Sequence, residues 1–320
     1  MVKADQIVSA VKTLDAARTP EAKCKAAWQI ANSHLSPRSS DLPLLEGCKT
    51  DLDCAEAYAK FYVDKIKTLS DGFPDRGVDD DSGDCPVGGP TMDGNFKFHS
   101  IGVATTKKLL RKISSTKSSS FDGIPAFFWK RLSQSLAAPI CHLINASFEQ
   151  GVYPDVFKAA KLVPVYKGVP KSRTEAASYR PVWLLPSLSK LFEAAALEQL
   201  TEYFEEKGLL ASQQHGFRKG KSTSTAILTA MYKWDSTKGS IHAAAFDYSS
   251  AFDLIDHNVL LKKLEDAGIG QNAMTWIKSY MTGGTMTVRW NTATGTPFVV
   301  DRGVRQGSLL GPPPLHHHDV

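Results

Sequence analysis

Long hydrophobic runs and a secretory signal are both missing from this 320-residue chain. No segment of about eighteen consecutive apolar residues occurs, so the sequence predicts no transmembrane helix. The first twenty residues lack the apolar core and small-residue cleavage site of a signal peptide, which favours a soluble, intracellular protein. The chain also has no internal repeat, which excludes a solenoid.

The five cysteines are few, odd in number and widely spaced. None of them belongs to a C-x-x-C pair, so the sequence favours neither a disulfide framework nor a zinc cluster. We expect free thiols at all five positions, which are Cys24, Cys48, Cys54, Cys85 and Cys141.

Positive charge is concentrated in one part of the chain. The net charge is +5, yet residues 1–95 hold 11 Lys and Arg against 16 Asp and Glu, and residues 181–320 hold 13 of each. Residues 96–180 hold 14 Lys and Arg against 4 Asp and Glu, a local net charge of +10. This pattern is typical of a surface that faces phosphate groups, although a lysine-rich solvated face has the same composition.

The hydrophobic pattern predicts helices interleaved with few strands. The layout is that of an α+β or mixed α/β fold in which helices back a small sheet. Helices are predicted at 55–69, after Thr106, from Pro125, at 139–150, from Leu188 to a cap at Gly208, and at 222–234, 257–267 and 271–281. Strands are predicted at 161–168 and 241–246 and in a hairpin of 285–290 with 296–304.

Two segments are predicted to lack regular structure. Residues 71–95 are dense in Asp, Gly and Pro and have little to bury, so we interpret them as a linker. Residues 179–187, YRPVWLLPS, are predicted to form an extended turn because their prolines exclude a helix interior.

The most informative segment is AAAFDYSSAFDLIDH, residues 243–257. Asp247 directly follows a predicted strand, which is where a carboxylate can hold Mg²⁺ against a phosphate. An Asp at the end of a strand can equally be a turn or helix-capping residue. For Asp253 and Asp256 we expect capping or a structural ion pair, because a helical continuation would point Asp253 away from Asp247.

Further candidates for phosphate or nucleotide contacts lie in three loops. In GVRQGSLLGP, residues 303–312, two glycines flank Arg305 and Gln306, so the backbone can approach a planar ligand or simply form a tight turn. Lys167 and Arg180 bracket another loop, and Arg218, Lys219 and Lys221 lie in a third, QHGFRKGKST. Lys and Arg suit a triphosphate, although surface lysines are usually only solvated.

Six segments together resemble the reverse transcriptase domain of non-LTR retrotransposons, the LINE-type elements of the Jockey kind. They occur in the family's order between about Phe96 and Pro312: SSSFDGIPAFFWKRL, GVYPDVFKAAKLVPVYKG, SYRPVWLLPSLSKLFE, QHGFRKGKST, FDYSSAFDLIDH and GVRQGSLLGP. YAKFYVDKIKTL at 58–69 is similar to the helix that often precedes this domain.

The resemblance implies a right-hand polymerase that copies an RNA template into DNA from a DNA primer and deoxynucleoside triphosphates. Asp247 matches the first catalytic and Mg²⁺-binding carboxylate of the palm, and the carbonyl of Tyr248 would be an extra ligand. Phe252 matches the bulky gate against a ribose 2′-hydroxyl. The other matched positions are Gln306 and Gly307, which support the nucleotide and its template partner, Lys167 and Arg180, which hold the triphosphate, and Arg218 with Lys219 in a basic tract that contacts nucleic acid.

The implied reaction is two-metal phosphoryl transfer, which needs several carboxylates. In the family two of them belong to a Tyr-x-Asp-Asp motif after the Gln-Gly pair, and that motif is absent from these 320 residues. We therefore expect fingers and a partial palm with a mainly antiparallel sheet, no thumb, and no polymerisation by this chain. Arg305 and Trp183 depart from the family's usual proline and small residue, which we expect to loosen their loops.

The expected division is a helical N-terminal region (1–70), a linker (71–95), fingers (96–240), a partial palm (241–312) and an aberrant tail (313–320). The resemblance implies a location in the cytoplasm, the nucleus or both, with no membrane partner. The alternative hypothesis is a non-catalytic module that binds RNA or DNA through its basic fingers segment.

Overall fold

The computed structural model describes residues 41–72, 95–113, 122–168, 170–247, 250–299, 301–305 and 307–311. Contacts within the chain separate residues 1–44 from residues 45–320, and every element below belongs to the second unit. Residues 73–94 of the predicted linker and the predicted tail at 313–320 lie outside the described residues.

Within these residues the fold is mixed α/β, with eight helices and five short strands. The helices are α3 (Asp51–Asp71), α4 (Val103–Lys112), α5 (Ala126–Arg131), α6 (Ser133–Gln150), α7 (Ser189–Glu206), α8 (Thr223–Asp235), α9 (His257–Asp266) and α10 (Gln271–Met281). The strands are β1 (Ala160–Tyr166), β2 (Tyr179–Leu184), β3 (Thr285–Trp290), β4 (Ala293–Thr294) and β5 (Phe298–Val299).

The strands form one small mixed sheet. Its order is β2-β1-β3-β4, and β5 also pairs with β3. The β1–β3 pair is parallel, whereas β1–β2, β3–β4 and β3–β5 are antiparallel. The predicted strand at 161–168 and the predicted hairpin from 285 are thus confirmed, with a second arm only two residues long in β5.

Residues 179–184 form strand β2, so the prediction of an extended turn at 179–187 was wrong for most of its length. Proline disfavours a helix, but it is tolerated on the edge strand of a sheet, and β2 is an edge strand. Pro181 lies opposite Pro164 of β1. Neither residue has an N–H to donate, so this pair occupies a position at which the two strands exchange no hydrogen bonds.

The helix predicted at 139–150 begins six residues earlier, at Ser133, and Pro139 lies inside it. Residues 139–150 are helical as predicted, and only the predicted start was wrong, because it treated this proline as the first residue of the helix. The missing N–H of Pro139 removes only one bond of the helix, while Ile140, Ile144 and Phe148 stay buried on one face. Packing outweighs the local penalty here.

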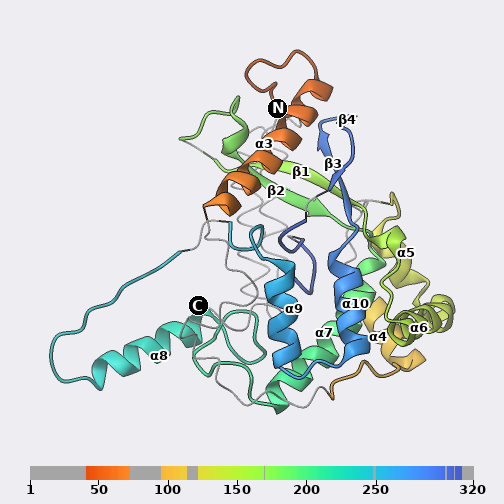
Figure 1. Cartoon of the computed structure of the whole chain (residues 1–320), viewed down its shortest axis with the longest axis vertical. Helices are drawn as coiled ribbons and strands as arrows, with labels where there is room; N and C mark the ends of the chain where they lie inside the picture. Colours follow the sequence, from red (N-terminus) through yellow and green to blue (C-terminus); the bar gives the residue numbers. More distant parts are fainter. Residues whose placement is uncertain are drawn as a thin grey trace, which may run out of the picture. The chain divides into compact units, whose positions relative to one another are not determined.

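A helical core lies below the sheet in the view of Figure 1 and contains α4, α6, α7, α9 and α10. Trp276 of α10 is fully buried at its centre, and its indole N–H donates to Ser147 Oγ (2.8 Å). Aromatic rings surround this indole, with centroids 5.2–5.9 Å away, and belong to Phe98, Phe148, Tyr153 and Tyr280. Aromatic packing of this density supplies much of the buried apolar area of the core.

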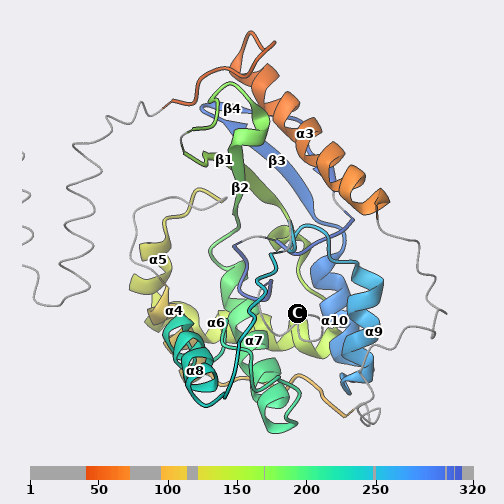
Figure 2. The same cartoon turned by 90° about the vertical axis from the view of Figure 1, so that its left-hand side faces the viewer.

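Helix α3 packs along the sheet (Figure 2). It begins with a capping box made by Thr50 and Asp53, which confirms a helix over the predicted 55–69. The ring of Tyr58 contacts Tyr179 of β2 and Trp290 of β3, and Tyr62 contacts Trp183. The segment that precedes the matched motifs is therefore part of the same compact unit as the sheet.

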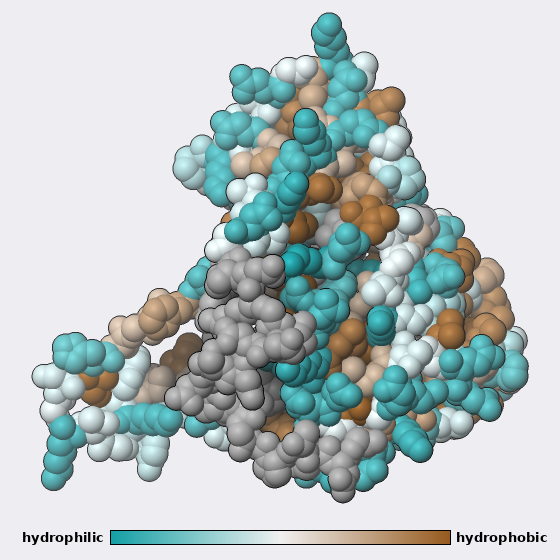
Figure 3. Space-filling view, viewed as in Figure 1, coloured by the Kyte–Doolittle hydropathy of each residue, from teal (hydrophilic) through white to brown (hydrophobic). Residues whose placement is uncertain are grey.

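Helix α8 and the segment after it lie apart from this core. Ser222 closes a capping box at the start of α8, yet none of the helix's thirteen residues is buried. Hydrophobic surface is visible on this outlying part (Figure 3). In α8, Leu228 is 64% exposed and Tyr232 is 75% exposed. The strand predicted at 241–246 is wrong: these residues are exposed and pair with no described strand, and a strand cannot satisfy its backbone without a neighbour.

Candidate functional site

Two of the motif segments, residues 250–257 and 303–311, lie against each other. Gly303 N–H donates to the carbonyl of Ile255 (2.8 Å) and Val304 N–H to that of Phe252 (2.8 Å). His257 Nε2 donates to the carbonyl of Gly303 (2.8 Å). The structure thus brings the segments around residues 250–257 and 303–311 into direct contact, although about fifty residues separate them in sequence.

The glycines of the 303–311 segment allow close backbone packing. Gly303 has a φ of +79°, and a Cβ there would lie 2.7 Å from the carbonyl oxygens of Phe252 and Asp253. Gly307 has a φ of +106° and faces the carbonyl of Trp183 in β2. Ser308 N–H donates to the carbonyl of Arg305 (3.0 Å), so the tight-turn alternative is present. Gln306 lies outside the described residues.

A buried carboxylate that sequence reasoning missed anchors the end of this segment. Glu193 of α7 is fully buried, and Leu309 N–H donates to its Oε2 (2.5 Å). Burial raises the pKa of Glu193 to about 7, against the opposing effects of the Leu309 N–H and the charge of Arg305. The available signal was one acidic residue in the otherwise apolar and small run LFEAAAL.

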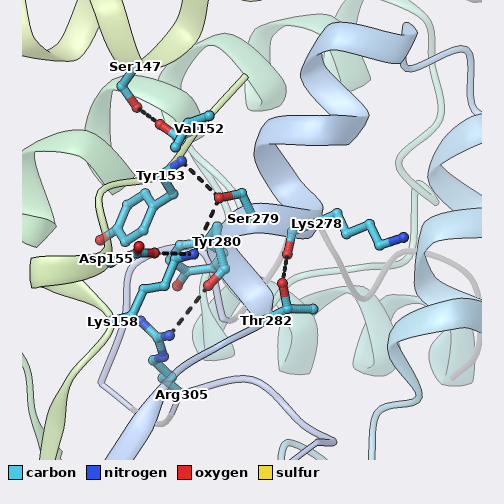
Figure 4. A network of polar contacts seen from close by, with 10 residues as sticks. All are labelled: Ser147, Val152, Tyr153, Asp155, Lys158, Lys278, Ser279, Tyr280, Thr282 and Arg305. Atoms are coloured by element: carbon cyan, nitrogen blue, oxygen red, sulfur yellow. Dashed lines mark hydrogen bonds and ion pairs between the residues drawn. The ribbon is translucent and has the colours of Figure 1, made fainter. Parts of the chain in front are cut away.

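Arg305 lies beside this carboxylate and is held by α10. Its Nη2 donates to the carbonyl of Tyr280 (3.4 Å), and its guanidinium carbon lies 5.5 Å from the centroid of the Tyr280 ring (Figure 4). Gly284 makes room, because a Cβ there would be 2.6 Å from Arg305 Nη2. The expectation that Arg305 loosens its loop is therefore not supported: the side chain is packed.

A second polar group lies next to Arg305 in Figure 4. Ser279 Oγ accepts from Tyr153 N–H (3.0 Å) and from Lys158 Nζ (3.4 Å), and Lys158 also pairs with Asp155 (2.8 Å). These contacts tie the turn after α6 to the end of α10. They fix the backbone from which strand β1 starts.

The acidic residues of the 247–257 motif have different environments. Asp256 caps α9, accepting from Asn258 N–H (2.8 Å), and pairs with Arg302 (3.1 Å), as expected. Asp253 is buried and accepts a hydrogen bond from Tyr62 OH (3.0 Å). Asp247 is exposed, Tyr248 lies outside the described residues, and Phe252 is half-buried.

The residues described here do not suffice for a magnesium centre. Two-metal chemistry needs several carboxylates around the ions. Among the described residues no group of three His, Cys, Asp or Glu side chains could hold a metal ion, and Asp247 offers one carboxylate. The residues present do not fit the pair of ions.

The two predicted triphosphate residues lie at one end of the β1–β2 pair. Arg180 is the register partner of Val165, and Lys167 N–H donates to the carbonyl of Ser178 (2.9 Å). Lys167 Nζ donates to the carbonyl of Ala177 (2.7 Å). Partial burial, followed by the charges of Lys171, Lys65 and Arg180, lowers the pKa of Lys167.

The other two basic candidates lie in the loop between α7 and α8. Arg218 forms two hydrogen bonds with Glu205 (2.7 and 2.8 Å) and one with the carbonyl of Ala211 (2.8 Å). These bonds brace the loop. Lys219 is exposed beside it.

Comparison with known proteins identifies the domain. Residues 169–313 match the family model described as reverse transcriptase (RNA-dependent DNA polymerase). These residues form a reverse transcriptase domain. The chain is related to the reverse transcriptases of non-LTR retrotransposons, as the sequence predicted.

Relatives of this reverse transcriptase domain occur in Drosophila melanogaster. The chain is 32% identical over 289 residues to a probable RNA-directed DNA polymerase from transposon X-element, covering 85% of this chain and 30% of that protein. It is 29% identical over 210 residues to a putative 115 kDa protein in type-1 retrotransposable element R1DM (63% and 19%) and 26% identical over 225 residues to the RNA-directed DNA polymerase from mobile element jockey (68% and 24%). The chain thus spans less than a third of the length of each of these relatives.

Reverse transcriptases generally use Mg²⁺, nucleic-acid template and primer, and deoxynucleoside triphosphates.

No described helix combines the length and hydrophobicity that crossing a bilayer requires.

Proposed function

We propose that this chain is the nucleotide- and template-binding part of an RNA-directed DNA polymerase, with fingers at 96–240 and a partial palm at 241–312. The match of residues 169–313 to the reverse transcriptase family carries this proposal. The packing of the 303–311 segment on the 250–257 segment supports it, because it gathers separate motifs on one side of the sheet.

Each matched residue receives one role. Lys167 and Arg180 bind the triphosphate, Phe252 excludes a ribose 2′-hydroxyl, and Gln306 with Gly307 supports the base pair being formed. Two further roles concern nucleic acid and metal. Lys219 and Arg218 lie along the nucleic acid, Arg218 while paired with Glu205, and Asp247 with the Tyr248 carbonyl contributes to Mg²⁺ binding.

Two-metal nucleotidyl transfer is the reaction of the complete site. A complete set of carboxylates, of which Asp247 would be one, would hold Mg²⁺, which would supply activation of the primer 3′-hydroxyl and neutralisation of charge on the leaving pyrophosphate. This chain contributes nucleotide binding and orientation, because Asp247 alone is too few carboxylates and no Tyr-x-Asp-Asp occurs in the sequence. We therefore predict binding without polymerisation.

A primer-extension assay tests this function. Poly(rA) with oligo(dT) and labelled dTTP is expected to give no extended product with this chain, while the hybrid itself binds and is released between about 50 and 200 mM salt. A product that disappears in Asp247→Ala would contradict the predicted inactivity. Failure of the chain to bind both the hybrid and dTTP would refute the proposed function itself.

The non-catalytic alternative is distinguished by nucleotide binding. A retained nucleic-acid module would bind the hybrid with the same salt dependence, through the +10 segment at 96–180, but would not bind dTTP. Lys167→Ala separates the two hypotheses: it removes dTTP binding under the polymerase proposal and only weakens the hybrid under the alternative.

A further inference from the structure

Helix α3 lies outside the residues that match the reverse transcriptase family, yet it holds the segment that carries Phe252. Tyr62 OH donates to Asp253 Oδ1 (3.0 Å), and Asp253 is the residue directly after Phe252. Lys65, about one turn further along α3, donates from Nζ to Ser250 Oγ (2.7 Å). Two side chains of one helix therefore bind this segment, one before Phe252 and one after it.

The contact between Tyr62 and Asp253 is buried. Tyr62 is 3% exposed and Asp253 is 5% exposed, so their hydrogen bond lies in a low-dielectric surrounding, where it is stronger than in water. Burial and then the charge of Asp253 raise the pKa of Tyr62, so the hydroxyl group keeps its proton and donates it. Loss of this donor would destabilise the buried carboxylate, and the backbone that carries Asp253 would move.

Tyr62 is itself fixed in position. Its ring packs edge-on against Trp183 of β2, with 6.4 Å between the centroids. Tyr58, one turn earlier in α3, packs in the same manner against Tyr179 of that strand. The face of α3 that contacts Asp253 is thus the face that packs on the sheet, and the donor has a restricted position.

The backbone around Phe252 is also held by the second motif segment. Val304 N–H donates to the carbonyl of Phe252 (2.8 Å), and a Cβ on Gly303 would lie 2.7 Å from that carbonyl oxygen. Asp253 N–H donates to the carbonyl of Ser250 (2.9 Å), which closes a turn that contains Phe252. The peptide between Phe252 and Asp253 therefore has little freedom as long as the Asp253 side chain is held.

We propose that Tyr62 is a positioning residue that, through Asp253, sets the place of Phe252 and so determines the preference for deoxynucleotides over ribonucleotides. This inference rests on the proposed function, in which Phe252 excludes a ribose 2′-hydroxyl. Such exclusion requires that the side chain be held to within about 0.5 Å. Helix α3 then takes part in substrate selection as well as supporting the sheet.

Equilibrium dialysis tests the proposal with labelled UTP and labelled dTTP in the presence of poly(rA) and oligo(dT). The ratio of the UTP dissociation constant to that of dTTP measures the preference. Tyr62→Phe removes only the hydroxyl group, and it is expected to lower this ratio about fivefold, a part of the value of a hydrogen bond to a charged group. A general loss of stability would weaken both nucleotides equally, so an unchanged ratio would overturn the proposal.

Tyr203→Phe is the matched control, because it makes the same chemical change at another tyrosine. The hydroxyl group of Tyr203 donates to the carbonyl of Ala267 (2.9 Å), just after α9. The ratio is expected to stay unchanged in this variant. An equal fall in Tyr203→Phe and Tyr62→Phe would show that the effect is not specific to the Asp253 contact, and the proposal would fail.

Asp253→Leu removes the same contact from the other side. Leucine keeps a similar volume and offers no acceptor, so this variant is expected to lower the ratio at least as far as Tyr62→Phe. In the double variant the two effects are expected not to add, because both remove one hydrogen bond. Additive effects would mean that Tyr62 does not act through Asp253, which would overturn the proposal.

The remaining outcomes separate this inference from the proposed function. If Phe252→Ala lowers the ratio and Tyr62→Phe does not, the inference fails while the proposed function stands. If the unsubstituted chain binds dTTP and UTP equally, the role of Phe252 and the inference both fail, whereas nucleotide binding stands. If it binds neither nucleotide, the inference fails together with the proposed nucleotide binding.

Discussion

Helices α7 and α8 are neighbours in sequence but differ in what holds them. Half of α7's residues are buried, including Phe192, Ala196 and Leu200, and its Glu193 binds the 303–311 segment. Helix α8 has a capping box, yet it buries no residue. A helix satisfies its own backbone hydrogen bonds, so α8 needs no neighbouring element to pair its backbone.

The segment after α8 shows the limit of that rule. Residues 241–246 are as apolar as β1, but a strand needs a hydrogen-bonded neighbour, and the described chain offers none there. The backbone of α8 is therefore hydrogen-bonded within the helix itself, whereas residues 241–246 would need a neighbouring strand. The stability of this unit is expected to reside in the packed core, and three substitution pairs test that expectation.

The largest effect is expected from tryptophan. Trp276→Ala removes a fully buried indole and its bond to Ser147, at a cost of about 4 kcal/mol in the free energy of unfolding. Trp234→Ala on α8, where the side chain is 49% exposed, is expected to change it by less than about 0.5 kcal/mol. Urea denaturation of both variants measures the difference, and equal losses would show that α8 is packed in solution.

The next effect is a pH dependence that arises from Glu193. The pKa of Glu193 is raised to about 7 in the folded chain. The contribution of Glu193 to the free energy of unfolding is therefore complete below its ordinary pKa of 4.5 and is lost as the pH rises through 7. The loss is about 3 kcal/mol. Urea denaturation from pH 5 to pH 8 should show this decline, and Glu193→Gln should remove it.

Glu198→Gln changes an exposed glutamate on the same helix and is the matched control. Its pH profile is expected to follow that of the unsubstituted chain. A profile for Glu193→Gln that also follows it would mean that Glu193 is not the titrating group.

The smallest effect concerns two glycines with positive φ. Gly303→Ala adds a Cβ 2.7 Å from two carbonyl oxygens at a φ of +79°, at a cost of about 2 kcal/mol. Gly239→Ala lies in the segment after α8, where φ is also positive (+116°) but no atom lies within 4 Å of the new Cβ, so it adds backbone strain without a clash. Its cost is expected to be about 1 kcal/mol. Thermal unfolding compares them; a larger cost at Gly239 would contradict the picture of an unpacked segment.

Much of the helical fold could be predicted from sequence because its signals are local. The caps at Thr50, Ser222 and Asp256 and the apolar periods of α7 and α10 depend on nearby residues alone. The prediction of a strand at 241–246 was wrong, and strand β2 was not predicted, because strand formation depends on neighbours far away in sequence. Pro181 is acceptable only because β2 is an edge strand.

The candidate site was likewise predictable from sequence only in its local features. Motif order indicated the reverse transcriptase family, and capping by Asp256 followed from spacing. The contacts of Glu193 with Leu309, of Tyr62 with Asp253 and of Lys65 with Ser250 join residues more than a hundred positions apart. The periodicity of a single sequence does not indicate which distant residues are in contact.

The facing prolines of β1 and β2 also affect association between molecules. At a position where paired strands exchange no bonds, each amide points away from its partner, so Pro181 leaves the outer rim of β2 without a donor there. A strand of another molecule that paired with this outer edge of β2 would lack a hydrogen bond in the middle of the strand. Pro181 therefore hinders the addition of a further strand to the exposed edge of β2, and so hinders aggregation into fibres through that edge.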